Sequence, residues 1–425
     1  RAIGRATARF IGGSPLVVGR DARPSSPELF DALVRGVTDE GVDIADIGLS
    51  STPMVYFAVE TLAAAGGVMI TASHNPTEYN GFKVCREHAI PIGIASGLAE
   101  IEALSGTCAT EAPAEPRGRV RRADILEPYV EHLLAVGSGR PALHVAIDVG
   151  NGMAGIALER LLERLPLRVE RLYFEPDGRF PNHEADPLKS ENLTDLIEAV
   201  KKSGAHFGVA FDGDADRAIF VDDRGEIVSS DLMTALLARP RLRRSPGGLV
   251  LFDLRSSRST PEAIEEAGGR AEMSRVGHSF VKATMRERDA IFAGELSGHF
   301  YFRFSPTLVA DDGIAAFMAL LDVMAEEARP LSELIAPLRR YHASGEISRR
   351  VKDPERLLSE IEADHGDASD ISHLDGLLVQ YPEWWFNLRP SNTEPVVRLN
   401  VEARTREQME RERDRLLARM EHAAR

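Results

Sequence analysis

Short apolar segments alternate with longer segments of helical periodicity along most of the chain. Compact apolar runs favour buried strands, and apolar residues at helical spacing favour amphipathic helices. The strand-like runs are 16–18, 67–70, 143–147, 207–211 and 248–252, and the helix-like runs are 26–36, 155–165, 193–202, 260–267 and 313–327. Strands separated by helices of this length predict βαβ units, and therefore an α/β fold.

Three segments interrupt this alternation, at 105–119, 238–248 and 336–345. They are rich in alanine, proline, glycine or arginine, as linkers often are. After the third segment the strands become shorter, the pair Trp384-Trp385 appears, and a charged helix is expected from Thr405. The pattern predicts three α/β domains, at 1–122, 123–236 and 237–340, and a smaller C-terminal α+β domain at 341–425.

Composition narrows the class of protein. The 425 residues are 43% hydrophobic, enough for several cores, and no apolar run is long enough to span a membrane. The net charge of −15 argues against a nucleic-acid partner, although a local basic site would still accept a small anion. Cys85 and Cys108 are the only cysteines, so a disulfide framework is not expected. We therefore expect a cytoplasmic location.

The first candidate site is residues 71–76, the serine loop, which contains Ser73, His74 and Asn75. It follows a strand-like run, and open α/β sheets bind ligands at the carboxyl ends of their strands. A hydroxyl beside an imidazole suits a nucleophile. An ordinary Ser/Asn turn explains the same residues about equally well.

The second candidate is residues 212–217, the aspartate loop, with Asp212, Asp214, Asp216 and Arg217. Three alternating carboxylates repel one another unless a cation lies among them, and oxygen ligands favour Mg²⁺ or Ca²⁺. An EF-hand is excluded because Arg217 and Asp223 stand where that loop needs glycine and glutamate. A solvated acidic turn is the alternative. Arg217 could engage a phosphoryl group.

Two further loops carry weaker signals. Residues 294–299, the glutamate loop, hold Glu295 and Ser297, which can bind neighbouring sugar hydroxyls, and His299, which could carry a proton or contact phosphate. Residues 389–395, the arginine loop, offer a guanidinium, two hydroxyls and an amide that could cradle a phosphate. Either loop could also be a polar turn.

Residues 150–155 fit the pattern G-x-G-x-x-G after a strand, and Glu170 follows about 20 residues later. This is the best argument for an NAD-dependent oxidoreductase, although any tight strand-to-helix turn can use these glycines. Lysine is scarce, with 6 of the 51 basic residues. Lys83 and Lys282 each lie close to a motif, which indicates a need for an ammonium group there.

Taken together, the loops resemble the α-D-phosphohexomutase family, the phosphoglucomutase/phosphomannomutase group. The matching segments, in order, are 18–23, 71–76, 79–83, 148–152, 176–183, 212–217, 276–279, 294–299 and 389–395. Nearly the whole chain is covered. In this light 150–155 is a structural turn that opens the second domain. Family members usually begin earlier, with an Asp-Ile-Arg-Gly segment, so the chain is expected to lack an N-terminal piece.

The resemblance implies three related α/β domains with mixed sheets and a smaller α+β domain, heart-shaped around a central cleft. It implies a phosphorylated Ser73, one Mg²⁺ held by Asp212, Asp214, Asp216 and the Ser73 phosphate, and a proton-transfer role for Lys83. Arg217 and His299 complete the implied catalytic set. The implied substrate contacts are Arg255, His278, Glu295, Ser297, Arg389, Ser391, Asn392 and Thr393, and His74 and Asn75 complete the serine loop.

The implied reaction interconverts hexose 6-phosphate and hexose 1-phosphate. It passes through phosphoserine and a hexose 1,6-bisphosphate, which also acts as activator. Mannose is the expected sugar, with glucose as a second substrate, and phosphoglucosamine mutase is the alternative. An NAD-dependent oxidoreductase and a catalytically silent homologue are more remote alternatives. The expected partner is a small phosphosugar, with no nucleic acid and no membrane, for a monomer or homodimer.

Overall fold

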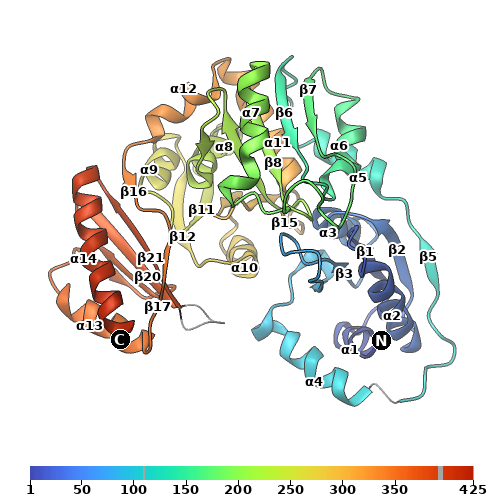
Figure 1. The fold of residues 1–425 in the computed structure, drawn as a ribbon. Helices are drawn as coiled ribbons and strands as arrows, with labels where there is room; N and C mark the ends of the chain where they lie inside the picture. The colour runs from blue at the N-terminus through green and yellow to red at the C-terminus, as the bar shows by residue number, and fades with distance from the viewer. Residues whose placement is uncertain (109–110, 391–395, 425) are drawn as a thin grey trace.

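Four β-sheets follow one another along the chain. The computed structural model describes residues 1–425 except 109–110, 391–395 and 425. Figure 1 shows the four units along an arc, with the N-terminal unit (blue) at one end and the C-terminal unit (red) at the other. Three mixed five-stranded sheets and one antiparallel six-stranded sheet confirm the predicted fold class of three α/β units and a smaller final unit.

The first unit has the strand order β4-β3-β1-β2-β5, and β4 alone runs antiparallel to its neighbour. Its strands are β1 (Leu16–Arg20), β2 (Ile44–Leu49), β3 (Gly66–Ile70), β4 (Phe82–Arg86) and β5 (Val120–Arg122). Its helices are α1 (Ala2–Ile11), α2 (Ser26–Asp39), α3 (Thr52–Thr61) and α4 (Leu98–Cys108).

The second unit has the order β10-β9-β8-β6-β7. Its strands are β6 (His144–Asp148), β7 (Arg168–Leu172), β8 (Phe207–Phe211), β9 (Ala218–Asp222) and β10 (Ile227–Val228). Its helices are α5 (Leu126–Leu134), α6 (Ala154–Leu162) and α7 (Thr194–Ser203). All five residues of β8 are buried, as expected for an inner strand.

The third unit has the order β12-β11-β13-β14-β15. Its strands are β11 (Leu249–Asp253), β12 (Arg270–Ser274), β13 (Phe292–Gly294), β14 (Phe300–Arg303) and β15 (Val309–Asp311). Its helices are α8 (Ser230–Arg244), α9 (Ser259–Glu266), α10 (His278–Arg288), α11 (Gly313–Glu327) and α12 (Leu331–Ile335). Helix α11 also contacts α5 and β9, so it joins the third unit to the second.

The fourth unit is an antiparallel sheet of order β16-β21-β20-β19-β18, with β17 paired to β21. Its strands are β16 (His342–Ala343), β17 (Ile347–Arg350), β18 (Asp370–Ser372), β19 (Leu377–Gln380), β20 (Trp384–Pro390) and β21 (Val396–Ala403). Two helices, α13 (Pro354–Asp364) and α14 (Arg406–Ala424), complete it. Its core is separate from those of the other three units.

The first three units repeat one arrangement that positions the candidate loops. In each, a parallel strand is followed by an antiparallel neighbour, giving the pairs β3–β4, β8–β9 and β13–β14. The serine loop follows β3, the aspartate loop joins β8 to β9, and the glutamate loop joins β13 to β14. Three chemically different loops therefore occupy the same topological place in three related sheets.

One expected linker is wrong. Residues 238–244 form the second half of α8, which contains Pro240, and β11 begins soon afterwards at Leu249. Much of α8 is buried, and tertiary packing outweighs the local effect of proline and arginine on the chain. The arginines of this segment all lie within the helix, and only positions 245–248, which contain one proline and two glycines, connect it to β11.

Candidate active site

The serine loop is held by a buried arginine. Ser73 has φ 52° and is 7% exposed, and its backbone N–H donates to Oγ1 of Thr71 at 2.9 Å. Arg23, 1% exposed, donates to the carbonyl oxygens of Ser73 and Asn75 at 2.8 and 2.6 Å, and pairs with Asp21 at 3.0 Å. The sequence analysis gave Arg23 no role, although it lies in the matching segment 18–23.

Ser73 reaches the aspartate loop of the next unit. Its Oγ donates to Oδ2 of Asp212 at 2.8 Å and lies 3.3 Å from Nδ1 of His74. Burial, and then the charge of Arg217, lower the pKa of His74. Gly213 permits this close approach, because a Cβ there would lie 2.5 Å from the carbonyl oxygen of Ser73. Asn75 remains exposed.

The three aspartates lie together in the interior. Asp212 and Asp214 are 0% exposed and Asp216 is 2% exposed. Nζ of Lys83 lies 2.6 Å from Oδ2 of both Asp214 and Asp216. Burial opposes the charge of Lys83, but the two aspartates outweigh it and raise the Lys83 pKa. Thr52, the first residue of α3, also donates its hydroxyl to Asp214.

This cluster fits a metal ion. The ligand oxygens of Asp212, Asp214 and Asp216 all lie within 4.8 Å of one another. Oδ1 of Asp214 and Oδ1 of Asp216 are buried without a hydrogen-bond partner among the described residues. Burial, and then the charges of Asp216 and Asp214, raise the pKa of Asp212 well above its ordinary value. A cation would satisfy these oxygens and relieve the repulsion.

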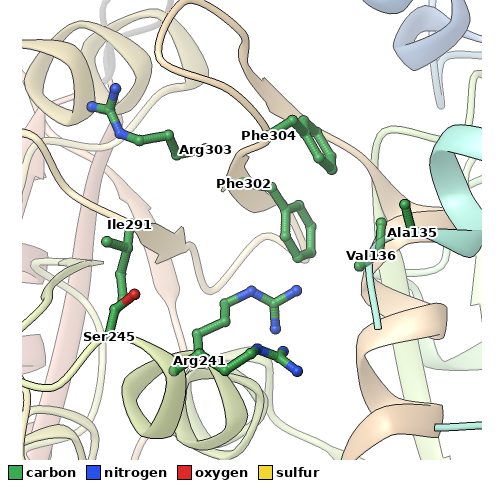
Figure 2. A pocket seen from close by; sticks show the side chains of 9 residues that line it. Ala135, Val136, Arg241, Ser245, Ile291, Phe302, Arg303 and Phe304 are labelled. Atoms are coloured by element: carbon green, nitrogen blue, oxygen red, sulfur yellow. The ribbon is translucent and has the colours of Figure 1, made fainter. Parts of the chain in front are cut away.

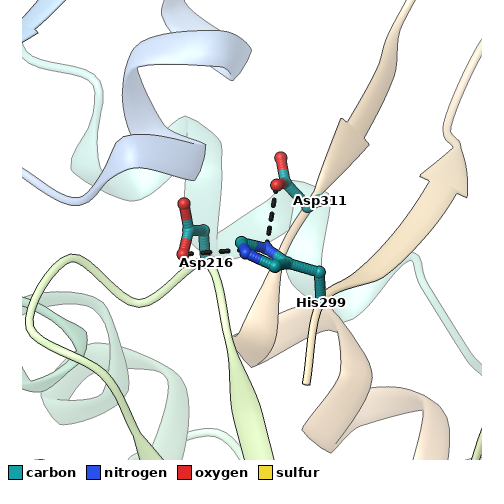
Figure 3. A group of neighbouring side chains, drawn as sticks. All are labelled: Asp216, His299 and Asp311. Atoms are coloured by element: carbon teal, nitrogen blue, oxygen red, sulfur yellow. Dashed lines mark ion pairs between the residues drawn. The ribbon is translucent and has the colours of Figure 1, made fainter. Parts of the chain in front are cut away.

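Arg217 connects the aspartate loop to the glutamate loop. Its Nε donates to Nε2 of His299 at 3.0 Å and lies 3.7 Å from Oδ2 of Asp212. The other ring nitrogen of His299 lies 3.1 Å from Oδ2 of Asp311 and 3.8 Å from Oδ1 of Asp216, as Figure 3 shows. Nδ1 of His299 therefore faces both Asp216 of the acidic cluster and Asp311, a second buried carboxylate that the sequence analysis did not single out.

Glu295 is buried and already engaged by the protein. One carboxylate oxygen accepts from the N–H of Gly277 at 2.6 Å, and the other accepts from the hydroxyl of Tyr301. Ser297 is partly exposed. His278 opens α10 with its ring 6.4 Å from that of His299, and burial lowers the pKa of His278 to about 3. The ring of His278 is therefore neutral near pH 7.

Three arginines converge on one carboxylate between the third and fourth units. Arg255 and Arg389 each lie 3.6 Å from Oε2 of Glu346, and Arg398 lies 3.8 Å from Oε1. Nε of Arg389 is buried without a partner among the described residues. Arg398 was not expected, because it lies on β21 outside the loop pattern. Arg255 also pairs with Asp253 at 2.8 Å. Three positive charges against these two negative charges favour an additional anion. Ser391, Asn392 and Thr393 lie outside the described residues.

Two further features, the turn at 150–155 and a separate cavity, lie outside the four loops. In the turn 150–155, the N–H of Met153 donates to the carbonyl of Gly213 at 2.9 Å, so the turn packs against the aspartate loop. A separate cavity of 370 Å³, drawn in Figure 2, is lined by Arg241, Phe302 and Phe304 among others. None of its lining residues belongs to the four loops.

The site combines a serine suited to act as a nucleophile, a carboxylate cluster suited to bind a metal ion, and converging arginines. Contacts between units bring these groups together. They define an enzyme of phosphate chemistry.

Family models describe the chain almost completely. The models for phosphoglucomutase/phosphomannomutase α/β/α domains I, II and III match residues 1–108, 127–225 and 229–341, and the model for the C-terminal domain matches residues 346–419. The chain belongs to the phosphoglucomutase/phosphomannomutase family.

Individual relatives support this family assignment. The chain is 40% identical over 410 residues to a protein of Xanthomonas campestris described as phosphohexose mutases, covering 95% of this chain and 90% of that one. It is 39% identical over 415 residues to an Escherichia coli phosphomannomutase, again covering 95% and 90%. A crystal structure of a phosphoglucomutase/phosphomannomutase family protein from Burkholderia thailandensis has a TM-score of 0.90 and 34% identity, covering 99% and 93%.

The protein is therefore an isomerase, a hexose phosphate mutase of carbohydrate metabolism, and its acidic cluster could hold a metal ion. The second family domain spans the turn at 150–155, which leaves the remote alternative of a dinucleotide fingerprint without support. Among the described residues, no helix has both the length and the apolar character that a membrane crossing requires.

Proposed function

We propose that this chain is a Mg²⁺-dependent phosphohexomutase that moves a phosphoryl group between O1 and O6 of a hexose phosphate through Ser73. One observation carries the proposal: Oγ of Ser73 lies 2.8 Å from Oδ2 of Asp212, across the boundary of two units. A hydroxyl so close to a candidate metal ligand is suited to phosphoryl transfer. The relatives named phosphomannomutase favour mannose phosphates, with glucose phosphates as second substrates.

The reaction has two half-reactions at one site. In the first, the phosphorus–oxygen bond at Ser73 breaks and a new bond forms to the free hydroxyl of the hexose phosphate, giving a hexose 1,6-bisphosphate. That hydroxyl loses its proton to His299, whose Nε2 becomes free to accept it when Arg217 turns from the ring to the transferring phosphoryl group. In the second, the bisphosphate returns its other phosphoryl group to Ser73, whose hydroxyl gives its proton to Lys83 while His299 returns its proton to the sugar oxygen that leaves. Released bisphosphate would rephosphorylate Ser73 and so act as activator.

Asp212, Asp214, Asp216 and the Ser73 phosphate would hold one Mg²⁺. When bound, the ion supplies positive charge beside the transferring group. Arg217 adds a guanidinium on the same side, at 3.7 Å from Asp212. Lys83, which Asp214 and Asp216 keep as an ammonium, is the proton donor when Oγ of Ser73 leaves.

The substrate contacts divide between two units. Arg255, Arg389 and the loop residues Ser391, Asn392 and Thr393 would clamp the phosphate that does not react. His278 and Ser297 would contact the sugar, and Glu295 would orient it by sharing oxygens that Gly277 and Tyr301 already engage. We assign one of the four loops to each of the domains 1–122, 123–236, 237–340 and 341–425.

The test is a coupled assay of mutase turnover on mannose 1-phosphate, glucose 1-phosphate and glucosamine 1-phosphate. Mannose 1-phosphate should give the highest kcat/KM. Ser73→Ala should abolish turnover and leave an intact mass free of a phosphoryl group, whereas Ser359→Ala, an exposed serine on α13, should change neither. More than about a tenth of wild-type activity in Ser73→Ala would show that Ser73 is not the carrier. A clear preference for glucosamine would replace the substrate assignment.

Metal dependence is tested on the same protein. Removal of divalent ions with EDTA should stop turnover, and Mg²⁺ should restore it. Asp214→Asn should weaken Mg²⁺ binding, because it removes a ligand charge. Full turnover in buffer shown by elemental analysis to be free of metal would rule out the metal role of the aspartate cluster.

A further inference from the structure

A single glutamate lies among the three arginines Arg255, Arg389 and Arg398, which we call the arginine cluster. Glu346 directly precedes β17, in the short connection from β16. Its Oε2 lies 3.6 Å from Nη1 of Arg255 and 3.6 Å from Nη2 of Arg389, and its Oε1 lies 3.8 Å from Nε of Arg398. Arg389 and Arg398 are cross-strand neighbours on β20 and β21. One carboxylate is therefore shared by guanidinium groups from two units.

The glutamate is held loosely. All three distances are longer than the roughly 2.7–3.2 Å of an N–H···O hydrogen bond. By contrast, Arg255 holds Asp253 at 2.8 Å through Nη2, and the side chain of Asp253 is fully buried. The side chain of Glu346 is 28% exposed. Glu346 can therefore leave the arginines for water at little cost, whereas Asp253 is a fixed partner of Arg255.

The charges show what the glutamate opposes. Among the described residues, the cluster combines three guanidinium groups with the carboxylates of Asp253 and Glu346, which leaves one positive charge. A phosphate group brings about two negative charges. Without the charge of Glu346, the cluster would carry two positive charges and would balance that phosphate. Glu346 therefore repels the anion that the arginines attract.

A supporting role for Glu346 is the competing interpretation, in which the carboxylate orients the arginines for the substrate. A carboxylate in that role is expected to grip a guanidinium with two short hydrogen bonds. Asp253 does so on Arg255, at 3.2 Å to Nε and 2.8 Å to Nη2, and Glu346 does not. Nε of Arg389 is also buried without a partner in the part of the chain that the structure describes. The contacts favour a weak counter-ion.

We propose that Glu346 is an internal counter-anion of the arginine cluster, which pairs with the arginines when they hold no phosphate and competes with the phosphate that does not react. The proposal rests on the proposed function, in which a bisphosphate must release one phosphate from these arginines and offer them the other. By replacing the departing phosphate, Glu346 lowers the cost of that release. It touches no reacting atom and is a positioning residue that acts through the arginines.

The binding test is a calorimetric titration with inorganic phosphate, in which the heat from the cluster is identified by its loss in Arg389→Ala. Glu346→Gln should lower Kd by about 3- to 10-fold, because it removes one nearby negative charge and keeps the shape of the side chain. Glu346→Asp, which keeps the charge, should stay closer to wild type. The control is Glu355→Gln, the same change of charge at an exposed position of α13, which should leave Kd unchanged.

The kinetic test uses mannose 1-phosphate. Glu346→Gln should lower KM and kcat together, because tighter binding of the remote phosphate slows its release from the arginines. A higher Kd would show that Glu346 supports the arginines, and an unchanged Kd would show that it does not compete; both overturn the proposal. So would a fall in Kd that Glu346→Asp or Glu355→Gln reproduces, or a kcat that stays at the wild-type value. If wild type itself lacks mutase turnover, the proposed function fails, and the phosphate titration still decides whether Glu346 opposes anion binding.

Discussion

Arg389 illustrates how a single residue can be placed both to bind a phosphate and to connect the fourth unit to the third. It shares Glu346 with Arg255 of the third unit and with its neighbour Arg398, and its Nε has no described partner. A phosphate entering this cluster meets a surplus of guanidinium groups. Because two parallel hydrogen bonds can form to one guanidinium, Arg389 should contribute more than a neutral hydroxyl.

We expect Arg389→Ala to raise KM for a hexose 1-phosphate by about tenfold or more, since a hydrogen bond to a charged group is worth about 1.5–3 kcal/mol. It should also lower kcat, because binding energy at the remote phosphate helps to orient the sugar. Arg389→Lys should recover only part of the loss. Steady-state kinetics, with the exposed Arg356→Ala as control, measure this. An unchanged KM and kcat would mean that Arg389 does not bind the substrate phosphate.

His132 is a residue whose environment makes stability depend on pH. Its ring lies among Phe57, Phe304 and Tyr129, with centroid distances of 4.7, 4.4 and 6.2 Å. Burial lowers the pKa of His132 to about 4. The unfolded chain takes up the proton near pH 6.5, so the folded state binds fewer protons between about pH 6.5 and 4. His132 therefore costs stability as the pH falls through this window, and nothing further below it.

Replacing the imidazole of His132 with a phenyl ring tests this direction of the pH dependence of stability. His132→Phe should lose less stability than wild type between pH 6.5 and 4, while above pH 7 the gap between the two proteins should be constant. Urea denaturation midpoints from pH 4 to 8 measure the difference, with His422→Phe, an exposed residue near the C-terminus, as control. Parallel curves for wild type and His132→Phe would contradict a buried neutral imidazole.

At the scale of elements, α11 is the clearest case of a helix whose environment follows from its composition. Twelve of its fifteen residues are buried, and the sequence is apolar on almost every face. Its start is defined by Asp312, whose side chain accepts from the N–H of Ala315 at 2.9 Å. Asp322, the one buried charge within it, accepts from the N–H groups of Ser138 and Gly139 and from Arg244.

Shortening a buried side chain of α11 should lower the stability of the protein. Leu320 is 0% exposed within the largest hydrophobic cluster, and Leu320→Ala should lower the free energy of unfolding by about 2–5 kcal/mol because it leaves a cavity in this core. Leu374→Ala, at a site that is 41% exposed, should change it by less than about 0.5 kcal/mol. Urea denaturation of both variants measures this. Equal small effects would mean that α11 does not anchor the shared core.

At the scale of the whole molecule, one arginine fastens the fourth unit to the third. The guanidinium of Arg258 donates to the carbonyls of Tyr381 and Pro382 at 2.6 and 2.8 Å. Its backbone N–H donates to Glu402, which also accepts from Nε1 of Trp385 at 2.8 Å. Burial, the first of several causes, raises the pKa of Glu402. These contacts position the fourth unit, and with it Arg389, relative to Arg255.

Arg258→Ala should therefore loosen the last unit without disturbing the first two. We expect kcat/KM to fall by about tenfold, because the phosphate clamp is no longer held in register with the sugar. Mg²⁺ binding and phosphorylation at Ser73 should stay at wild-type levels. Small-angle X-ray scattering should show a larger radius of gyration. A radius and kcat/KM equal to those of wild type would mean that other contacts suffice to hold the fourth unit.

The sequence by itself determined the elements and the chemistry of the loops. Strand-like runs such as 207–211 became β8, and the helical run 313–327 became α11, because apolar periodicity is a local property. The serine and aspartate loops were recognisable because unusual residue types stand directly after apolar strands. Lys282 was noticed for the same kind of reason, since lysine is scarce here. Composition misled most at 238–248, where the packing of α8 outweighs local preference. The expected linkers at 105–119 and 336–345 also overlap α4 and β16.

Only the tertiary structure decided which residues act on one another. Arg23 supports Ser73, Tyr56 faces Lys282, and Arg258 holds the fourth unit, each across many residues of chain. Glu295 proved to be engaged by Gly277 and Tyr301, which no local pattern indicates. Periodicity reports which face of an element is buried, not which distant side chain it meets. Those pairings follow from how four sheets pack, and the orientation of His299 depends on that packing.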